Sequence, residues 1–253
     1  MKNLNSNGFT TVSIPTKLRK EIKLDIKKII LKKLKIKENL SYKEISSLVS
    51  KLSEKNFHTL FGGVPTRYLS LNTGKKINQW INHMKYVNGK INSLHFLSRK
   101  DLKLRSDLND KHYCVYFRCM RPNNLKKKIS FVHRDYDFWK IETPYTYPLS
   151  PFKISKRHKL WIPIWGCTHQ NSLRMIKKTH KKKIKVKYIK SNKILKPQIN
   201  LKENNILNEK NIKQPIKKFS KEAILFDDKV VHFAPQNLNK YMRISVEFTI
   251  ISK

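Results

Sequence analysis

Hydrophobic residues in the first third of the chain recur with helical spacing. Between Lys17 and Lys35 the apolar positions form one stripe and lysines fill most of the others; the stripe consists of Leu18, Ile22, Ile26, Ile29 and Ile30. Ser41 and Glu44 form a capping-box pattern ahead of a second apolar series, and residues 77–84 indicate a shorter helix. Residues 1–105 are therefore expected to be mainly helical. The amphipathic pattern of this lysine-rich segment predicts a helix whose apolar stripe packs against a sheet. The alternative is that this basic helix lies on an anionic membrane surface.

The later part of the chain alternates with the period of a β-strand. Between Tyr241 and Ile251, Met242, Ile244, Val246 and Phe248 share one face, and Arg243, Ser245 and Glu247 share the other. Residues 129–133, 223–226 and 230–233 are shorter apolar runs with strand character, separated by turn residues. We predict a β core over residues 106–253.

A Lys/Asn-rich stretch at residues 177–218, containing Pro197 and Pro215, interrupts this core. Residues 184–189 alternate like an edge strand, and the rest is too polar to suggest a core of its own. We expect either a lid or a surface loop without a role. The whole chain, residues 1–253, is predicted to be one domain, a size that β barrels often reach as a single unit.

Charge is the extreme feature of the composition. The 253 residues carry 56 basic and 17 acidic side chains, for a net charge of +39. Only ten of the basic residues are arginine, and readers of nucleic acid rely on arginine for bidentate contacts. Lysine spread along the whole chain, together with many Ile and Asn residues, is typical of an AT-rich coding sequence. We therefore expect a solvated surface and no specific nucleic-acid binding.

Targeting signals are absent from the sequence. The first seven residues have no apolar signal core, and no run approaches the roughly 18 apolar residues of a membrane span. The three cysteines, Cys114, Cys119 and Cys167, form no C-x-x-C pair, which favours reduced thiols and a cytoplasmic location.

Candidate chemistry begins with His133 and Asp135 at the end of a predicted strand. Residues two apart on a strand share a face, so both side chains leave it side by side. His232, on a second strand, would complete two imidazoles and a carboxylate, the facial triad that binds Fe(II) and leaves three positions open. Asp137 is a competing carboxylate, but its greater reach to His133 makes Asp135 the better ligand.

Arginine on the last strand suggests an anion site. Arg243 lies eleven residues after His232, and its planar fork can hold a carboxylate through two parallel hydrogen bonds. Ser245 could add a hydroxyl donor from the same face. Arg118, on a predicted strand at residues 112–120, could bind a second carboxylate or an anionic substrate.

Four segments resemble the Fe(II)/2-oxoglutarate-dependent dioxygenases, within them the phytanoyl-CoA dioxygenase-like branch. Together they span roughly residues 113–251. They are the H-x-D strand with its following aromatics at residues 131–139, the W-x-P and N-x-L runs at residues 160–181, the strand pair at 224–232, and the R-x-S of residues 243–245. Lys178 stands where this family usually has Pro or Gly.

The resemblance implies a double-stranded β-helix, a jelly-roll or cupin-like barrel of two antiparallel sheets. It further implies Fe(II) held by His133, Asp135 and His232, with 2-oxoglutarate and O2 as cosubstrates and Arg243 on the far carboxylate of 2-oxoglutarate. The activity to expect is hydroxylation of a small-molecule metabolite such as a sugar, a lipid or a secondary-metabolite intermediate. Lysines in the insertion favour an anionic substrate.

Other functions stay open at this point. An oxygenase that acts on nucleic acid or protein would explain the charge. A jelly-roll binding protein without catalysis would explain the fold but not the complete triad. A cupin-type metal enzyme would usually carry three histidines and a Glu, and a halogenase would lack the carboxylate that Asp135 supplies.

Overall fold

The structure is a computed structural model, and it describes residues 2–62, 67–83, 116–122, 132–138, 156–191, 194–206, 208–217 and 221–252. Its centre is a five-stranded sheet in the order β1-β8-β3-β10-β2, in which every neighbouring pair is antiparallel. The strands are β1 (Phe9–Ser13), β2 (Tyr116–Met120), β3 (Lys156–Trp165), β8 (Glu222–Asp227) and β10 (Arg243–Ser252).

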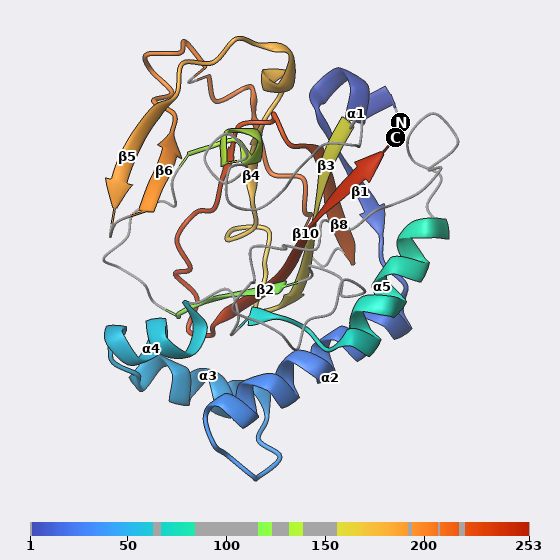
Figure 1. Cartoon of the computed structure of the whole chain (residues 1–253), viewed down its shortest axis with the longest axis vertical. Helices are drawn as coiled ribbons and strands as arrows, with labels where there is room; N and C mark the ends of the chain where they lie inside the picture. Colours follow the sequence, from blue (N-terminus) through green and yellow to red (C-terminus); the bar gives the residue numbers. More distant parts are fainter. Residues whose placement is uncertain are drawn as a thin grey trace.

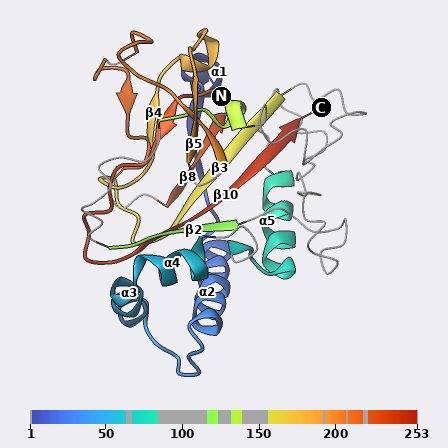
Figure 2. The ribbon, with the colours of Figure 1, turned by 60° about the vertical axis from the view of Figure 1, so that its left-hand side comes forward.

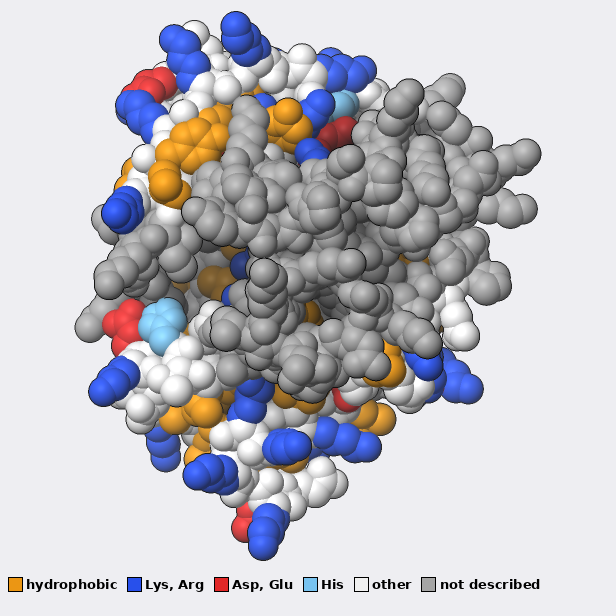
Figure 3. Space-filling view, viewed as in Figure 1, with side chains coloured by type: hydrophobic (Ala, Val, Ile, Leu, Met, Phe, Trp, Pro, Cys, Tyr) orange, Lys and Arg blue, Asp and Glu red, His pale blue; other side chains and the backbone are white. Residues whose placement is uncertain are grey.

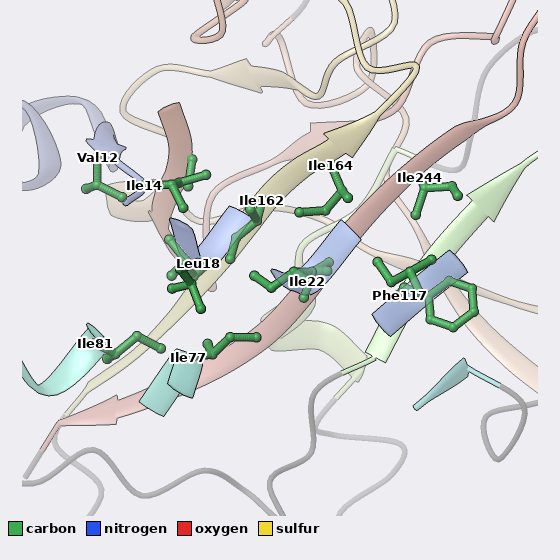
Figure 4. Close-up of a cluster of buried hydrophobic side chains, with 14 of the residues drawn as sticks. Val12, Ile14, Leu18, Ile22, Ile77, Ile81, Phe117, Ile162, Ile164 and Ile244 are labelled. Carbon is green, nitrogen blue, oxygen red and sulfur yellow. The ribbon is translucent and has the colours of Figure 1, made fainter. Parts of the chain in front are cut away.

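Helices cover one face of this sheet (Figures 1 and 2). They are α2 (Thr16–Lys33), α3 (Tyr42–Lys51), α4 (Glu54–Phe61) and α5 (Leu71–His83), preceded by the short α1 (Lys2–Asn7). The predicted stripe of α2 is buried as expected, with Ile22, Ile26 and Ile30 fully inaccessible. Figure 4 shows Leu18 and Ile22 of this stripe beside Ile162, Ile164 and Ile244 of the sheet, and Ile26 and Ile30 belong to the same hydrophobic cluster. The stripe is therefore the contact surface of a covering helix.

Local signals in the helical region also held. Ser41 caps α3 by accepting a hydrogen bond from the Glu44 backbone, and the Glu44 carboxylate accepts one from the Ser41 backbone N–H in return. The last helix, α5, begins at Leu71, six residues before the expected start at Ile77. Its final described residue is His83.

A second, smaller sheet has the order β7-β4-β9 and consists of β4 (Arg174–Ile176), β7 (Ile212–Lys213) and β9 (His232–Phe233). Between it and the large sheet lies a hydrophobic core to which Trp161, Ile224 and Phe226 contribute from the large sheet and Met175 from the small one. Two antiparallel sheets with a core between them agree with the jelly-roll expectation. The alternation of β10 divides its residues as predicted: Ile244 and Val246 join the helix-side core.

In the described part of residues 1–105 the chain is mainly helical, as expected, and it also contributes one strand. Phe9–Ser13 form β1, the outermost strand, paired with β8 in the register Phe9↔Phe226 to Ser13↔Glu222. Its side chains alternate between the two cores, with Phe9 in the inner core and Val12 on the helix side. Five residues are too short a run to stand out beside a long helical pattern.

The insertion at residues 177–218 is more ordered than its composition indicated. It contains the 3-10 turn η2 (Thr179–Lys181) and a two-stranded hairpin of β5 (Lys187–Ser191) and β6 (Ile194–Gln198). The expectation that it builds no core was wrong. Ile184, Ile199 and Ile206 from the insertion are buried with Ile176 and Val231 in a third hydrophobic cluster.

Three further expectations concern single positions. Lys178 has a φ of 63°, a left-handed conformation that glycine adopts without strain and lysine does not. Cys119 and Cys167 are free thiols, and burial raises the pKa of Cys119 to about 12 and that of Cys167 to about 11. Cys114 lies outside the described residues.

Across the described ranges, no helix combines the length and apolar character needed to cross a membrane.

Candidate metal centre

His133, Asp135 and His232 converge, with one potential ligand atom from each lying within 4.8 Å of the others. Asp135 Oδ1 is 4.0 Å from His133 Nε2, and Asp135 Oδ2 is 3.6 Å from His232 Nε2. The two imidazole centroids are 4.4 Å apart. The sequence-predicted ligands are thus brought together from segments almost one hundred residues apart.

The backbone brings the two histidines together. The His133 N–H donates to the His232 carbonyl at 3.1 Å, and the His232 N–H donates to the His133 carbonyl at 2.9 Å, forming an antiparallel bridge. This bridge attaches the H-x-D segment to β9 of the small sheet. Residues 129–131 of the expected strand lie outside the described residues.

Asp135 reaches the site in a different way from the expected strand geometry. Residues 135–138 form one helical turn, so the H-x-D pair is not a continuous strand. The Tyr136 N–H donates to the Asp228 carbonyl, and Arg134 makes a buried two-point ion pair with Asp137, both contacts at 2.7 Å. Asp137, the competing carboxylate, is therefore occupied by Arg134 and fixes the turn.

The orientation of His232 suits a ligand. Its Nδ1 lies 3.0 Å from the Val230 carbonyl, and a proton on Nδ1 leaves the lone pair of Nε2 toward Asp135. The ring also packs against Phe226, with centroids 4.9 Å apart. His133 meets Phe138 edge to face at 5.3 Å. Aromatic neighbours hold both rings in place.

The donor set fits a divalent cation. Asp135 is only 8% exposed, and within the described residues its Oδ2 is buried without a hydrogen-bond donor. A buried carboxylate oxygen without a donor costs several kcal/mol. A cation bound between the three side chains would supply the missing partner. Two neutral nitrogens and one carboxylate suit Fe(II), and three protein ligands leave coordination positions for other molecules.

Arg243 and Ser245 form a second polar site on the inner face of β10. Both are almost completely buried, at 3% and 0% exposure. Arg243 donates to the carbonyl of Asn171, while in the described structure its Nε and the Ser245 hydroxyl have no hydrogen-bond partner. Burial lowers the pKa of Arg243, but an arginine remains cationic at neutral pH. A buried cation beside an unpaired hydroxyl is a ready site for a carboxylate.

Arg118 lies directly opposite Ser245 in the β2–β10 pairing. Its Nε donates to Glu247 Oε2 at 2.6 Å, and Lys159 Nζ lies 3.3 Å from Glu247 Oε1. Burial alone would raise the pKa of Glu247, but Arg118 and Lys159 outweigh it and the pKa is lowered. Arg118 thus has a protein carboxylate as its partner, and a role toward a bound anion stays a prediction.

Lys159 and Glu247 were not identified from the sequence as site residues. The alternation of β10 placed Glu247 on the face of Arg243 and Ser245, which was the available signal. Lys159 was hidden among 46 lysines, yet it is 6% exposed. Its pairing with Glu247 depends on the register between β3 and β10.

Asp228 gives the region around the H-x-D turn a pH dependence. Burial raises its pKa to about 6, although Arg157 contacts it at 2.7 Å and opposes the shift. The folded state then binds more protons than the unfolded state between about pH 4 and pH 6, so Asp228 makes the protein less stable as the pH rises through that window. The difference is about 3 kcal/mol.

Asp228→Asn is expected to abolish this effect in the metal-free protein, because asparagine does not titrate. Denaturant unfolding of both proteins at pH 4, 5, 6 and 7 measures it. The variant should gain stability relative to the native protein by up to about 3 kcal/mol between pH 4 and pH 7. Parallel stability curves would contradict the raised pKa.

No family model and no curated protein sequence matches the chain. Solved structures match over its whole length. EvdO2 from Micromonospora carbonacea var. aurantiaca, complexed with 2-oxoglutarate, is 12% identical with a TM-score of 0.53, covering 100% of this chain and 89% of its own. EctD from S. alaskensis, with 2-oxoglutarate and 5-hydroxyectoine, is 10% identical with a TM-score of 0.52, covering 99% and 74%.

ThoJ, a non-heme monooxygenase in its apo form, is 9% identical with a TM-score of 0.53, covering 99% of this chain and 76% of its own. At these identities the likeness concerns the fold. Two of these three neighbours were solved with 2-oxoglutarate and the third is a non-heme monooxygenase, so the resemblance recognised in the sequence is confirmed at the level of fold.

Proposed function

We propose that this chain is a non-haem Fe(II)/2-oxoglutarate-dependent dioxygenase that hydroxylates a small-molecule metabolite. The observation that carries the proposal is the convergence of His133, Asp135 and His232 beside the small sheet of a two-sheet fold. The buried donors of Arg243 and Ser245 support it, because they provide for the far carboxylate of 2-oxoglutarate. Two of the structural neighbours hold that molecule.

Each residue has a role in this proposal. His133, Asp135 and His232 would hold the iron, and the Val230 carbonyl keeps the His232 ring oriented for it. Iron bound there would couple the oxidative decarboxylation of 2-oxoglutarate by O2 to oxygenation of a C–H bond. Arg243 would bind the distal carboxylate with Ser245 as a further donor. The apolar core that contains Trp161 and Phe226 borders the proposed iron site and limits the access of water to it from that side.

The charges of the interior favour an anionic substrate. Lys159 and Arg243 are buried cations on the inner side of the large sheet, Arg118 is a half-exposed one, and among the described residues Glu247 is the carboxylate that contacts Arg118 and Lys159. Iron would compensate the charge of Asp135, and 2-oxoglutarate that of Arg243. Cationic side chains on this side of the sheet therefore favour an anionic substrate.

Succinate formation tests the proposed activity directly. Purified protein loaded with Fe(II) is supplied with 2-oxoglutarate and O2 and screened against small metabolites in matched anionic and neutral forms. The proposal expects succinate above the uncoupled background with a subset of the anionic compounds. Iron-loaded protein that neither binds nor consumes 2-oxoglutarate would refute the assignment.

The β5–β6 hairpin is the proposed substrate wall. The Ile199 N–H, just after β6, donates to the carbonyl of Val132, next to the first histidine. The pKa of Tyr188 is raised by burial first and then by the charge of Asp137. Opposite Tyr188 on the hairpin lies Pro197, which is buried, whereas Ile189 points to the other face.

Tyr188→Ala is therefore expected to raise the substrate KM several-fold, or to uncouple 2-oxoglutarate consumption from hydroxylation, with iron binding preserved. Ile189→Ala is the matched control, since both residues are about equally exposed, at 41% and 42%, on opposite faces of one strand. A point variant is preferable to a deletion, because shortening residues 193–211 would remove Ile199 and Ile206 from their core. An equal substrate KM and equal coupling in both variants would show that the hairpin does not contact the substrate.

The charge remains a weak argument for a nucleic-acid substrate. On the part of the surface that Figure 3 colours, basic side chains are spread around the whole outline of the face. A dispersed charge gives non-specific, salt-sensitive attraction and no selection of sequence. We therefore favour a small-molecule substrate over a nucleic acid.

A further inference from the structure

A basic groove lies on the helix side of the molecule, across the large sheet from the inner face of β10 that carries Arg243. It encloses about 850 Å³. Lys20, Lys23, Leu24 and Lys27 of α2 form one wall, Ser41, Tyr42 and Lys43 at the start of α3 form another, and Trp165, Gly166 and Tyr241 complete it. Trp165 pairs with Ile244, whose side chain belongs to the helix-side core, so the groove is separate from the metal centre.

The floor of the groove is aromatic. Tyr42 stacks on Trp165 with ring centroids 4.8 Å apart and an interplanar angle of 26°, and Tyr241 lies 5.8 Å from Trp165 on a tilt. The Tyr42 hydroxyl donates to the Lys23 carbonyl, which ties α3 to α2. The three rings are half-buried, and lysine ammonium groups lie over two of them: Lys23 Nζ is 4.9 Å from the centroid of Tyr42, and Lys240 Nζ is 5.2 Å from that of Tyr241.

The rim of the groove is basic, and the described residues that line it include no acidic side chain. Of the nearby acids, Glu21 pairs with Lys76, whereas Glu44 and Asp25 accept hydrogen bonds from backbone N–H groups and keep their negative charge. Burial and the like charges of Arg19 and Lys27 lower the pKa of Lys23. Positive charge in the groove is therefore only partly compensated. In Figure 3, basic and apolar side chains alternate over the lower part of the face, where Figure 1 places α2 and α3.

The spacing of the lysines suits an extended anion. Lys20, Lys23 and Lys27 follow one another by three and four residues, so they share one face of α2 and span about 10 Å along its axis. Lys43 faces them from α3. A row of cations of that length matches a chain of phosphates better than a single carboxylate, and the aromatic floor beside it matches a planar ring.

We propose that this groove binds a nucleoside polyphosphate, with the base against Tyr42, Trp165 and Tyr241 and the phosphates along the lysines. The volume of the groove lies within the range of small-molecule sites. Stacking on an aromatic surface together with contacts to lysine gives affinity that neither element provides alone. The site goes beyond the proposed oxygenase activity and does not depend on it.

Binding of ATP to the iron-free full chain, measured by calorimetry at about 0.15 M salt, tests the proposal. Adenosine supplies the ring without the charge, and tripolyphosphate supplies the charge without the ring. ATP is expected to bind about tenfold or more tighter than either. Failure of ATP to bind would overturn the proposal, as would tripolyphosphate binding as tightly as ATP.

Two double variants distinguish binding in the groove from non-specific attraction to the net positive charge of the protein. Lys20→Gln with Lys43→Gln removes two exposed lysines of the groove, and Lys28→Gln with Lys32→Gln removes two exposed lysines of α2 outside it. The first pair should weaken ATP binding about fivefold or more, and the second less than about twofold. Equal losses would show non-specific attraction to a basic protein and overturn the site.

Trp165→Leu tests the aromatic floor. It should weaken ATP binding and leave tripolyphosphate binding unchanged, with circular dichroism confirming the fold. If the variant unfolds, the lysine pairs still decide the outcome. An oligonucleotide that binds more tightly than ATP, and loses affinity in the Lys20/Lys43 variant, would replace the small ligand by single-stranded nucleic acid.

Discussion

Replacing both His133 and His232 with alanine is expected to abolish iron binding and turnover while the fold stays intact. Two of the three proposed ligands are lost, and the remaining Asp135 carboxylate cannot hold a divalent cation alone. The expected loss of turnover exceeds the roughly 10–100-fold that removing a mere orienting partner of a ligand costs. Anaerobic titration with Fe(II), followed by succinate formation, measures both effects.

The fold should survive because the His133–His232 contact is carried by backbone atoms. Each N–H donates to the carbonyl of the other residue, and alanine retains both groups. Loss of the imidazoles does remove packing against Phe226 and Phe138, so thermal unfolding accompanies the titration. His58→Ala, at an exposed histidine of α4, controls for loss of a histidine as such. Stoichiometric iron in the double variant would refute the ligand assignment.

Arg243→Ala is expected to weaken 2-oxoglutarate binding by at least about thirtyfold, because loss of a buried charge partner typically costs ~2–5 kcal/mol. The carboxylate would then lack its cationic partner. Arg243→Lys should restore binding only in part, since an ammonium is a point charge and lacks the planar fork. Calorimetric titration of 2-oxoglutarate into the anaerobic iron-loaded protein measures the affinities.

Ser245→Ala provides a graded comparison for Arg243. It removes one neutral hydroxyl from the same strand face and should cost about 1 kcal/mol, or roughly fivefold in affinity. Arg121→Ala controls for loss of an arginine elsewhere, because Arg121 donates to the carbonyls of Ser50 and Leu52. If Arg243→Ala binds 2-oxoglutarate normally, another interior cation holds that carboxylate, with Lys159 and Arg118 as the next candidates.

Patterns within single elements predicted much of this fold. The stripe on α2, the cap of α3 and the alternation of β10 each depend on residues close together in sequence, and each was confirmed. The three candidate ligands were likewise brought together, although the strand geometry used to argue for Asp135 was wrong. Its neighbours Arg134 and Asp137 close a helical turn through an ion pair, which no strand pattern reveals.

Features that depend on partners far away in sequence were not predictable. Glu247 has Arg118 and Lys159 as partners because three strands pair in one register, and hydrophobic spacing does not determine that register. The insertion concealed its core because its buried isoleucines are few among many lysines and asparagines, and they meet only when the chain folds back. The left-handed backbone of Lys178 was also not predictable from the sequence pattern, since it belongs to a turn and not to a periodic element.

The position of β1 has a consequence for the integrity of the sheet. Phe9–Ser13 pair with Glu222–Asp227, a strand whose middle four residues are apolar and almost wholly buried. Without β1, the backbone N–H and carbonyl groups of that strand would form an open edge, and such edges recruit strands from other molecules. Shortened forms of the chain that begin at α2 should therefore aggregate, even though every residue of the proposed metal centre would still be present.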